Sequence, residues 1–215
     1  RRNAELIRRK PDEVLRLITD EKSVFTRHDV ARTLHRCIND NDSFQRALAA
    51  VMASRQLVEL QPERHDGVAR YSTREMIGIE HSMAASALRM AGRKTHGVRA
   101  DHVDHALDRQ DALLPASGLS HEQREAVRHI TSPHQIAAVI GFAGAGKSTM
   151  LAAARDAWEA QGFTVHGAAL AGKAAEGLTQ SSGIAARTLA SWEYGWNQGK
   201  GELQRGDIFV IDEAG

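Results

Sequence analysis

Residues Gly141–Ser148 read Gly-Phe-Ala-Gly-Ala-Gly-Lys-Ser, and this stretch decides the fold of the chain. It fits the pattern G-x-x-x-x-G-K-[ST], the Walker A phosphate loop. The glycines of such a loop let backbone N–H groups face a phosphate, and the N-terminus of the following helix adds partial positive charge. The pattern predicts that Lys147 reaches the β- and γ-phosphates of a nucleotide and that the Ser148 hydroxyl holds Mg²⁺.

The segments on either side support this interpretation. The apolar run Ile136–Ile140 precedes the loop and predicts a buried strand, and Thr149–Arg155 follows it and predicts a helix. A strand, a glycine-rich loop and a helix form the context that the motif requires. A glycine-rich turn that matches the pattern by chance is the alternative, and these flanking segments argue against it.

A second apolar run, Ile208–Ile211, is followed by Asp212 and Glu213. An acid at the carboxyl end of a buried parallel strand is typical of a Mg²⁺-binding aspartate in phosphoryl transfer. We expect Asp212 to hold Mg²⁺ and Glu213 to polarise the attacking water. This pair favours hydrolysis over transfer to a substrate hydroxyl, which disfavours a kinase. The alternative is a common acidic surface dipeptide.

Composition sets few limits on function. The 215 residues allow one large or two small domains, and a net charge of +1 requires any nucleic-acid contact to come from local patches. The single cysteine, Cys37, excludes a disulfide within the chain and fits a reducing compartment. We find no membrane-spanning run or signal peptide, so we expect a bacterial cytoplasmic protein without membrane insertion. Because the chain starts without Met and stops just past an apolar run, we expect an internal piece of a longer protein.

The first part of the chain, residues 1–72, combines short helices with two short strands. Three helical segments precede the strands Leu57–Leu60 and Val68–Ser72, with His65–Gly67 as the turn. This order is typical of a winged-helix-like α+β domain. Such modules bind DNA or proteins, and both roles stay open here. The arginines that would contact DNA are Arg27, Arg32, Arg36 and Arg70.

Residues 73–115 are predicted to form a helical connector. Thr73 begins a long helix whose apolar stripe, from Met76 to Met90, is expected to pack into a core. A shorter helix follows, with His102 and His105 on one face; a solvated acidic face is favoured there over a metal site. We interpret the segment from Asp111 to Gly118 as a linker.

In residues 116–215, predicted helices alternate with predicted strands, one of which is Phe163–Gly167. This alternation predicts a parallel sheet. The predicted fold class is therefore α/β. It comprises the winged-helix-like α+β domain, the helical connector, and the N-terminal part of a RecA-like P-loop parallel-sheet domain.

Several segments resemble those of superfamily 1 helicases of the RecD-like branch, in the same order. They are Leu119-Ser120-x-x-Gln123, Gly141–Thr149, Gly172–Ala175 and Ile211–Gly215. The sequences of Ala168–Leu178 and Arg187–Glu193 are more specific. They resemble the helicase region of TraA-type conjugative relaxase-helicases of the MobF class. The upstream segments Glu21–Thr26 and Ala69–Arg74 are similar to the region between relaxase and helicase in that family.

The resemblance implies an ATP-dependent DNA helicase that uses ATP and Mg²⁺ and acts on single-stranded DNA. In the intact protein, plasmid transfer-origin DNA and the conjugation machinery would be further partners. The implied nucleotide-binding residues are Gln123 (on adenine), Gly141, Gly144, Ala145, Gly146, Lys147, Ser148 and Thr149. The other implied roles are catalysis for Lys147 and Glu213, Mg²⁺ binding for Ser148 and Asp212, and DNA binding for Lys173 and Thr188.

Plainer interpretations of these residues stay open. Gln123 could be solvated, Lys173 could pack at a helix start, and Thr188 could be an N-cap. The aromatic residues Trp192, Tyr194 and Trp196 could stack on bases or pack within the protein.

At the level of the whole protein, the alternatives are a RecD-like repair helicase without a relaxase, and a nucleotide-silent DNA-binding or scaffold module. Tyr71 and Tyr194 do not lie in the context of a nicking tyrosine, so nicking is not expected. The later helicase motifs would lie after Gly215, so the chain alone is not expected to unwind DNA.

Overall fold

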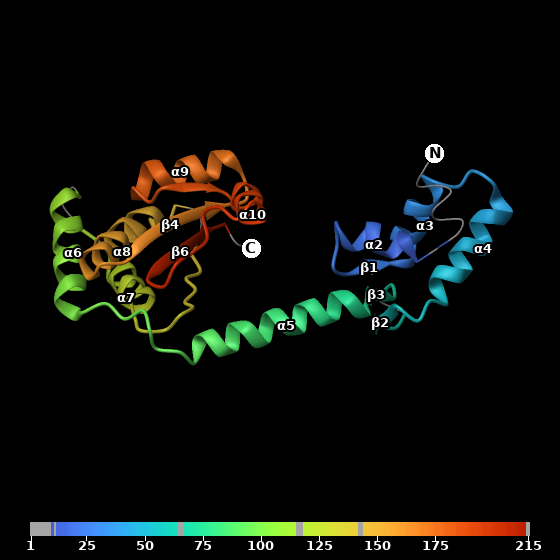
Figure 1. Cartoon of the computed structure of the whole chain (residues 1–215), viewed down its shortest axis with the longest axis horizontal. Coiled ribbons are helices and arrows are strands. Elements are labelled where there is room, and N and C mark those ends of the chain that lie inside the picture. Colours follow the sequence, from blue (N-terminus) through green and yellow to red (C-terminus); the bar gives the residue numbers. More distant parts are fainter. Residues whose placement is uncertain (1–9, 11, 64–66, 115–117, 142–143, 214–215) are drawn as a thin grey trace. The chain divides into compact units, whose positions relative to one another are not determined.

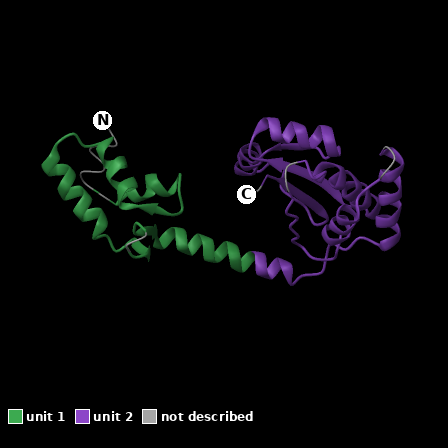
Figure 2. Cartoon of the chain, turned by 180° about the vertical axis from the view of Figure 1, so that it is seen from behind, with its two compact units in different colours: residues 1–86 green, residues 87–215 purple. Residues whose placement is uncertain are grey.

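The computed structural model describes residues 10, 12–63, 67–114, 118–141 and 144–213. The chain forms two compact units, Arg1–Ser86 and Ala87–Gly215 (Figure 2). Each unit has a hydrophobic core of its own. The two units are therefore described separately.

The first unit contains short helices and one small sheet. Its elements are α2 (Glu13–Thr19), β1 (Phe25–Thr26), α3 (Arg27–His35), α4 (Asn41–Met52), β2 (Leu57–Gln61) and β3 (Arg70–Thr73) (Figure 1). The strands are antiparallel in the order β1-β3-β2, with Phe25 opposite Tyr71 and Leu57 opposite Thr73. The predicted pairing of the two later strands is confirmed, whereas β1 was not predicted. His65 and Asp66 of the predicted turn lie outside the described residues.

The start of α3 is fixed by a capping box, as its sequence suggests. The Asp29 backbone N–H donates to Thr26 Oγ1 at 3.3 Å, and the Thr26 backbone N–H donates to Asp29 Oδ2 at 2.9 Å. Lys22 Nζ lies 2.9 Å from Asp29 Oδ1. The Lys22 hydrogen bond, and then the Thr26 N–H, lower the pKa of Asp29 from its ordinary value of 3.8 to about 2. Asp29 therefore stabilises the fold when it is ionised.

Asp29→Asn should lower the stability of the first unit by about 1 kcal/mol at pH 7, because the amide is a weaker partner for Lys22 and the capping box. The folded-state pKa is the lower one, so this contribution is complete above about pH 4 and is lost as the pH falls toward about 2. Amide hydrogen exchange of α3, measured from pH 7 to pH 3, checks this. Glu21→Gln, on an exposed carboxylate, is the charge-matched control. A wild-type-to-variant difference that stays constant over this pH range would contradict the assignment.

Helix α5 (Arg74–Ala91) begins as predicted, with the Met76 N–H donating to Thr73 Oγ1 at 3.1 Å. The expectation that its apolar stripe packs into a core is wrong. No residue of α5 is buried, and Ile79, Met83 and Leu88 are 54%, 67% and 75% exposed. Helical spacing of apolar residues places them on one face, but burial also requires another element against that face, and the described residues do not supply one.

The second unit is an α/β structure with a parallel sheet. Its further elements are α6 (Ala100–Leu113), α7 (His121–Ile130), α8 (Lys147–Gln161), β4 (Thr164–Ala169), α9 (Gly172–Ser182), β5 (Ala186–Thr188), α10 (Leu189–Asn197) and β6 (Asp207–Asp212) (Figure 1). The strands are parallel in the order β5-β4-β6. The predicted α/β class with a parallel sheet is confirmed, although β5 was not predicted.

Both faces of this sheet are covered, as parallel sheets require. On one face, Val165, Ile208 and Val210 pack into the core that surrounds α8. On the other face, Phe209 packs edge-on against Trp192 of α10, with ring centroids 5.1 Å apart. Helices α6, α7 and α8 lie side by side on the core (Figure 1). Among the described residues, no helix is both long and apolar enough to cross a membrane.

The prediction of a buried strand at Ile136–Ile140 is wrong. These residues have no assigned secondary structure, and Ile136 is 42% exposed and Ile140 fully exposed. An apolar run becomes a strand only beside another strand, and the described sheet has none next to this segment. Backbone pairing occurs instead just before this run, where the carbonyl of Pro133 accepts a hydrogen bond from the N–H of His96 at 3.1 Å.

Candidate nucleotide site

The phosphate loop leads directly into α8. Gly146 is the N-cap residue and has a left-handed backbone with φ of 74°, and Gly144 has φ of 79°. The N-cap residue is a glycine, which has no side chain to cap the helix. The positive end of the helix dipole favours an anion at this point. Phe142 and Ala143 lie outside the described residues.

The Lys147 side chain lies across its own loop. Its Nζ donates to the carbonyl of Gly141 at 2.8 Å. Ser148 and Thr149 follow in the first turn of α8, and both are half-buried. The ammonium group is therefore held at the mouth of the loop, within the segment that the motif assigns to phosphate binding.

Gln123 joins α7 to the phosphate loop. Its backbone N–H donates to Ser120 Oγ at 3.2 Å and its Oε1 accepts the Ser120 N–H at 2.9 Å, which completes a capping box. Its Nε2 donates to the carbonyl of Ala145 at 3.1 Å. A Cβ atom on Gly146 would overlap this Nε2 atom. Gln123 therefore contacts the loop and is also half-exposed to solvent. Its contact with adenine stays a prediction.

The loop lies at the carboxyl edge of the parallel sheet. Only Gly162 and Phe163 separate α8 from β4, so the helix runs antiparallel to β4 and starts near the end of that strand. Ala169, at the end of β4, is in register with both Asp212 of β6 and Thr188 of β5. Ligands of open α/β sheets bind at this edge. The structure thus brings the predicted phosphate and Mg²⁺ residues to one edge.

The Asp212-Glu213 pair has an unusual backbone. Glu213 has φ of 56°, the one positive value among the described non-glycine residues. Its N–H donates to Asp212 Oδ1 at 3.1 Å. Asp212 is half-buried and Glu213 is exposed. A left-handed conformation of a glutamate costs free energy, and such residues cluster at functional sites.

A magnesium ion at this edge would have few protein ligands. Within the described ranges, no group of three or more His, Cys, Asp or Glu residues could hold a metal ion, and this includes the surroundings of His102 and His105. Mg²⁺ at nucleotide sites typically takes one or two protein oxygens together with phosphates and water. The Ser148 hydroxyl and the Asp212 carboxylate are donors of that kind.

The two predicted DNA-binding residues also lie near this edge. Lys173 is exposed in the first turn of α9, just after β4. Thr188 Oγ1 accepts the Ser191 N–H at 3.2 Å, so Thr188 is the N-cap of α10. This cap was the plainer interpretation of Thr188, and a DNA contact stays a prediction.

The three clustered aromatic residues have different environments. Trp192 is buried, donates from Nε1 to the carbonyl of Gly167 at 3.0 Å, and has the Arg187 guanidinium 3.6 Å from its ring centroid. Packing therefore explains Trp192. Tyr194 is 71% exposed, and Trp196 is 37% exposed and donates from Nε1 to the carbonyl of Gly201 at 2.9 Å.

Sequence reasoning missed two residues beside the site. Asp111 was placed in a linker, but it lies in the last turn of α6 and forms an ion pair with Arg124 of α7. The two residues are 13 positions apart, beyond the reach of any helical or turn pattern, so only the fold brings them together.

Comparisons with known proteins identify what the chain is similar to. The model of a family described as "AAA domain" matches residues 118–215. The "Probable conjugal transfer protein TraA" of Sinorhizobium fredii is 48% identical over 99% of this chain and 19% of its own length. The resemblance to TraA-type proteins is confirmed.

Two further TraA relatives give the same picture. The "Conjugal transfer protein TraA" of Rhizobium radiobacter is 47% identical, and that of Agrobacterium fabrum is 43% identical. Each alignment again covers 99% of this chain and 19% of the relative. The chain thus spans about a fifth of the length of the TraA proteins that it matches.

Gly146→Ala should destabilise the second unit by about 1–3 kcal/mol, because an alanine would take a left-handed backbone and its Cβ would displace Gln123. Thermal unfolding followed by tryptophan fluorescence measures the change. Gly177→Ala is the matched control: Gly177 lies inside α9 with nothing within 4 Å of an added Cβ, so this variant should be stabilised by about 0.5–1 kcal/mol. Equal unfolding temperatures for Gly146→Ala and wild type would contradict the described loop.

Proposed function

We propose that this chain belongs to a conjugative relaxase-helicase and contains the ATP-binding part of its DNA motor. The observation that carries the proposal is the convergence of three features on one loop: the left-handed glycine N-cap of α8, Lys147 at the Gly141 carbonyl, and Gln123 at the Ala145 carbonyl. The names of the relatives, conjugal transfer proteins, support a role in plasmid DNA transfer. In the intact protein, ATP hydrolysis would drive translocation on single-stranded DNA.

The proposed domains follow the predicted boundaries. Residues 1–72 form a winged-helix-like domain, which the order α2-β1-α3-α4-β2-β3 and the three-stranded antiparallel sheet support. Residues 73–115 form a helical connector whose last helix, α6, packs on the core of the second unit. Residues 116–215 form the N-terminal part of a RecA-like domain, which the parallel sheet and the AAA-domain match support.

Each loop residue has a separate task in the proposed site. Backbone N–H groups of Gly144, Ala145 and Gly146 surround the phosphates, and Lys147 leaves the Gly141 carbonyl to contact the β- and γ-phosphates. Gly141 and Thr149 line the nucleotide at the two ends of the loop.

The remaining groups act on the metal ion and the water. Ser148 and Asp212 hold Mg²⁺, which neutralises charge on the phosphates when it is bound. The Glu213 carboxylate is exposed, and in the proposed site it would accept a proton from the attacking water. Gln123 contacts the adenine base.

Single-stranded DNA is the proposed partner of the same sheet edge. Lys173 is an exposed cation in the first turn of a helix, and it would contact a backbone phosphate. Thr188 is in register with Ala169, the last residue of β4, and would contact the DNA strand at the same end of the sheet. In the first unit, Arg27, Arg32, Arg36 and Arg70 are all exposed and would supply a second, sequence-independent contact.

Lys147→Ala should weaken Mg²⁺–ATP binding by about tenfold or more, because it removes a charge-assisted hydrogen bond to phosphate. Isothermal titration calorimetry on the 215-residue chain measures this. Lys200→Ala, which removes an exposed lysine of the same unit, is the control and should bind like wild type. Equal ATP affinity of wild type and Lys147→Ala would support the nucleotide-silent scaffold alternative instead.

Lys173→Ala should weaken binding of a fluorescent single-stranded oligonucleotide equally for all sequences. It should also reduce the slope of log affinity against log salt by about 0.7, the value for one phosphate contact on a single strand. Fluorescence anisotropy, measured at salt concentrations from about 50 to 200 mM, gives the slope. Lys200→Ala again serves as the control, and an unchanged slope for Lys173→Ala would remove Lys173 from the DNA site.

A further inference from the structure

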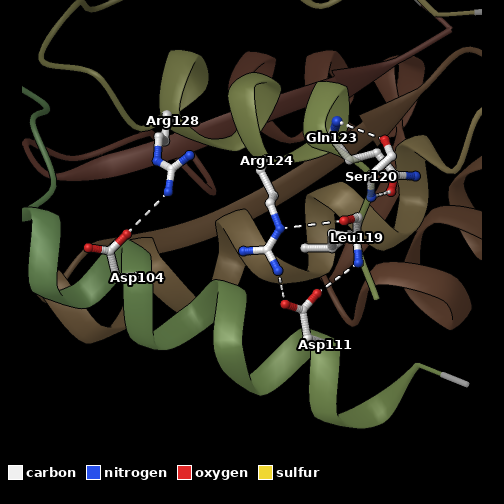
Figure 3. Close-up of polar contacts among 7 residues, drawn as sticks. All are labelled: Asp104, Asp111, Leu119, Ser120, Gln123, Arg124 and Arg128. Atoms are coloured by element: carbon white, nitrogen blue, oxygen red, sulfur yellow. Dashed lines mark hydrogen bonds and ion pairs between the residues drawn. The ribbon is translucent and has the colours of Figure 1, made fainter. Parts of the chain in front are cut away.

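One carboxylate fixes the connection between α6 and α7. Asp111 Oδ1 accepts the backbone N–H of Leu119 at 2.7 Å, and Asp111 Oδ2 pairs with the Arg124 guanidinium (Figure 3). Arg124 Nε donates back to the carbonyl of Leu119 at 3.4 Å. Two side chains from two helices therefore hold both backbone groups of Leu119. We call Asp111, Leu119 and Arg124 the clamp.

The clamp has little freedom. The side chains of Arg124 and Asp111 are 30% and 25% exposed, and the Leu119 side chain is buried. Gly118 has φ of 60°, and a Cβ atom there would lie 2.7 Å from Asp111 Oδ1. The carboxylate is thus packed directly on the backbone just before α7, which fixes the path of the chain into Ser120.

Ser120 transmits this position to the nucleotide loop. Its N–H, next along the chain from Leu119, donates to Gln123 Oε1 at 2.9 Å. The other end of the same amide, Nε2, donates to the Ala145 carbonyl at 3.1 Å. The two partners define which end of the amide is oxygen and which is nitrogen, because one is a donor and the other an acceptor. The Gln123 amide is thereby held in one orientation against the loop, and Figure 3 shows its contact with Ser120.

A fixed amide distinguishes adenine from guanine. A glutamine amide has two oxygen lone pairs and two N–H groups. The Ser120 N–H uses one lone pair and the Ala145 carbonyl uses one N–H, so one acceptor and one donor remain. Adenine presents the complementary pair, the N6 amino donor and the N7 acceptor, whereas guanine presents two acceptors, O6 and N7. A freely rotating amide would turn its nitrogen toward guanine, and the held amide does not.

We propose that Asp111 and Arg124 are positioning residues for base selection, which act through Ser120 by holding the Gln123 amide. This inference rests on the nucleotide site proposed above and assigns it a specificity element outside the phosphate loop. Among the described residues, no hydrogen bond or ion pair joins the clamp directly to the phosphate loop. Its loss should therefore reduce the preference for adenine without reducing phosphate affinity.

The test compares three ligands with Mg²⁺ on the 215-residue chain: ATP, GTP and inorganic tripolyphosphate. Wild type should prefer ATP over GTP by about tenfold, the effect of one good two-point base contact. Arg124→Met and Asp111→Asn should bring this ratio close to one and leave tripolyphosphate affinity within about twofold of wild type. Asp111→Asn is the milder variant, since its amide oxygen can still accept the Leu119 N–H.

The chain offers a matched control one helical turn away. Arg128 of α7 pairs with Asp104 of α6 at 3.5 Å, between the same two helices, without touching Leu119 or Gln123 (Figure 3). Arg128→Met should keep the wild-type ratio of ATP to GTP affinity. In a double-mutant cycle, Arg124→Met should have no further effect on that ratio once Gln123→Ala is present.

Each failure has a separate signature. If Arg124→Met and Asp111→Asn weaken all three ligands equally, or lower the unfolding temperature with the ratio intact, the clamp is only structural and the inference is overturned. If Lys147→Ala abolishes tripolyphosphate binding but wild type binds ATP and GTP equally well, the nucleotide site stands and the inference is overturned. If wild type and Lys147→Ala bind all three ligands alike, the proposed function fails, and the inference fails with it.

Discussion

Helix α8 is enclosed by its neighbours, because α6, α7, α9 and β4 all pack against it. Ala153, Ala154 and Ala157 are completely buried on this helix, and their small side chains let the neighbouring elements approach its backbone closely. The phosphate loop continues into the first turn of α8, so the loop takes its position from this packing. The direction of the loop N–H groups therefore depends on apolar contacts along α8 in the middle of the core.

The polar contacts around the loop are set by the same core. Leu107 of α6 is buried one turn before Asp111, and Val127 of α7 is buried one turn after Arg124. Because the apolar residues fix how the two helices meet, they also fix the reach of the two charged side chains. The result is that α6 and α7 hold the Gln123 amide, and α8 holds the phosphate loop that this amide contacts.

The sequence was informative wherever the structure depends on neighbouring residues. The helix after the phosphate-loop motif, and the helix starts at Thr26, Thr73 and Ser120, all follow from short patterns, and the structure contains each of these helices. Features that need a distant partner were missed or wrong. The Ile136–Ile140 run lacks a strand beside it in the described sheet, and the stripe of α5 lacks a covering element. Asp111 was assigned to a linker because its partner Arg124 lies on the next helix.

Strand β6 lies at one end of the described parallel sheet, so its outer edge faces no strand there. This edge carries the apolar run Ile208–Ile211, and Ile211 is 45% exposed. Open edges of this kind recruit strands from other molecules, and apolar β-branched residues with little charge between them strengthen that pairing. The solubility of the 215-residue chain therefore depends on keeping β6 apart from the β6 of a second molecule. In concentrated samples, two such strands can pair edge to edge and aggregate.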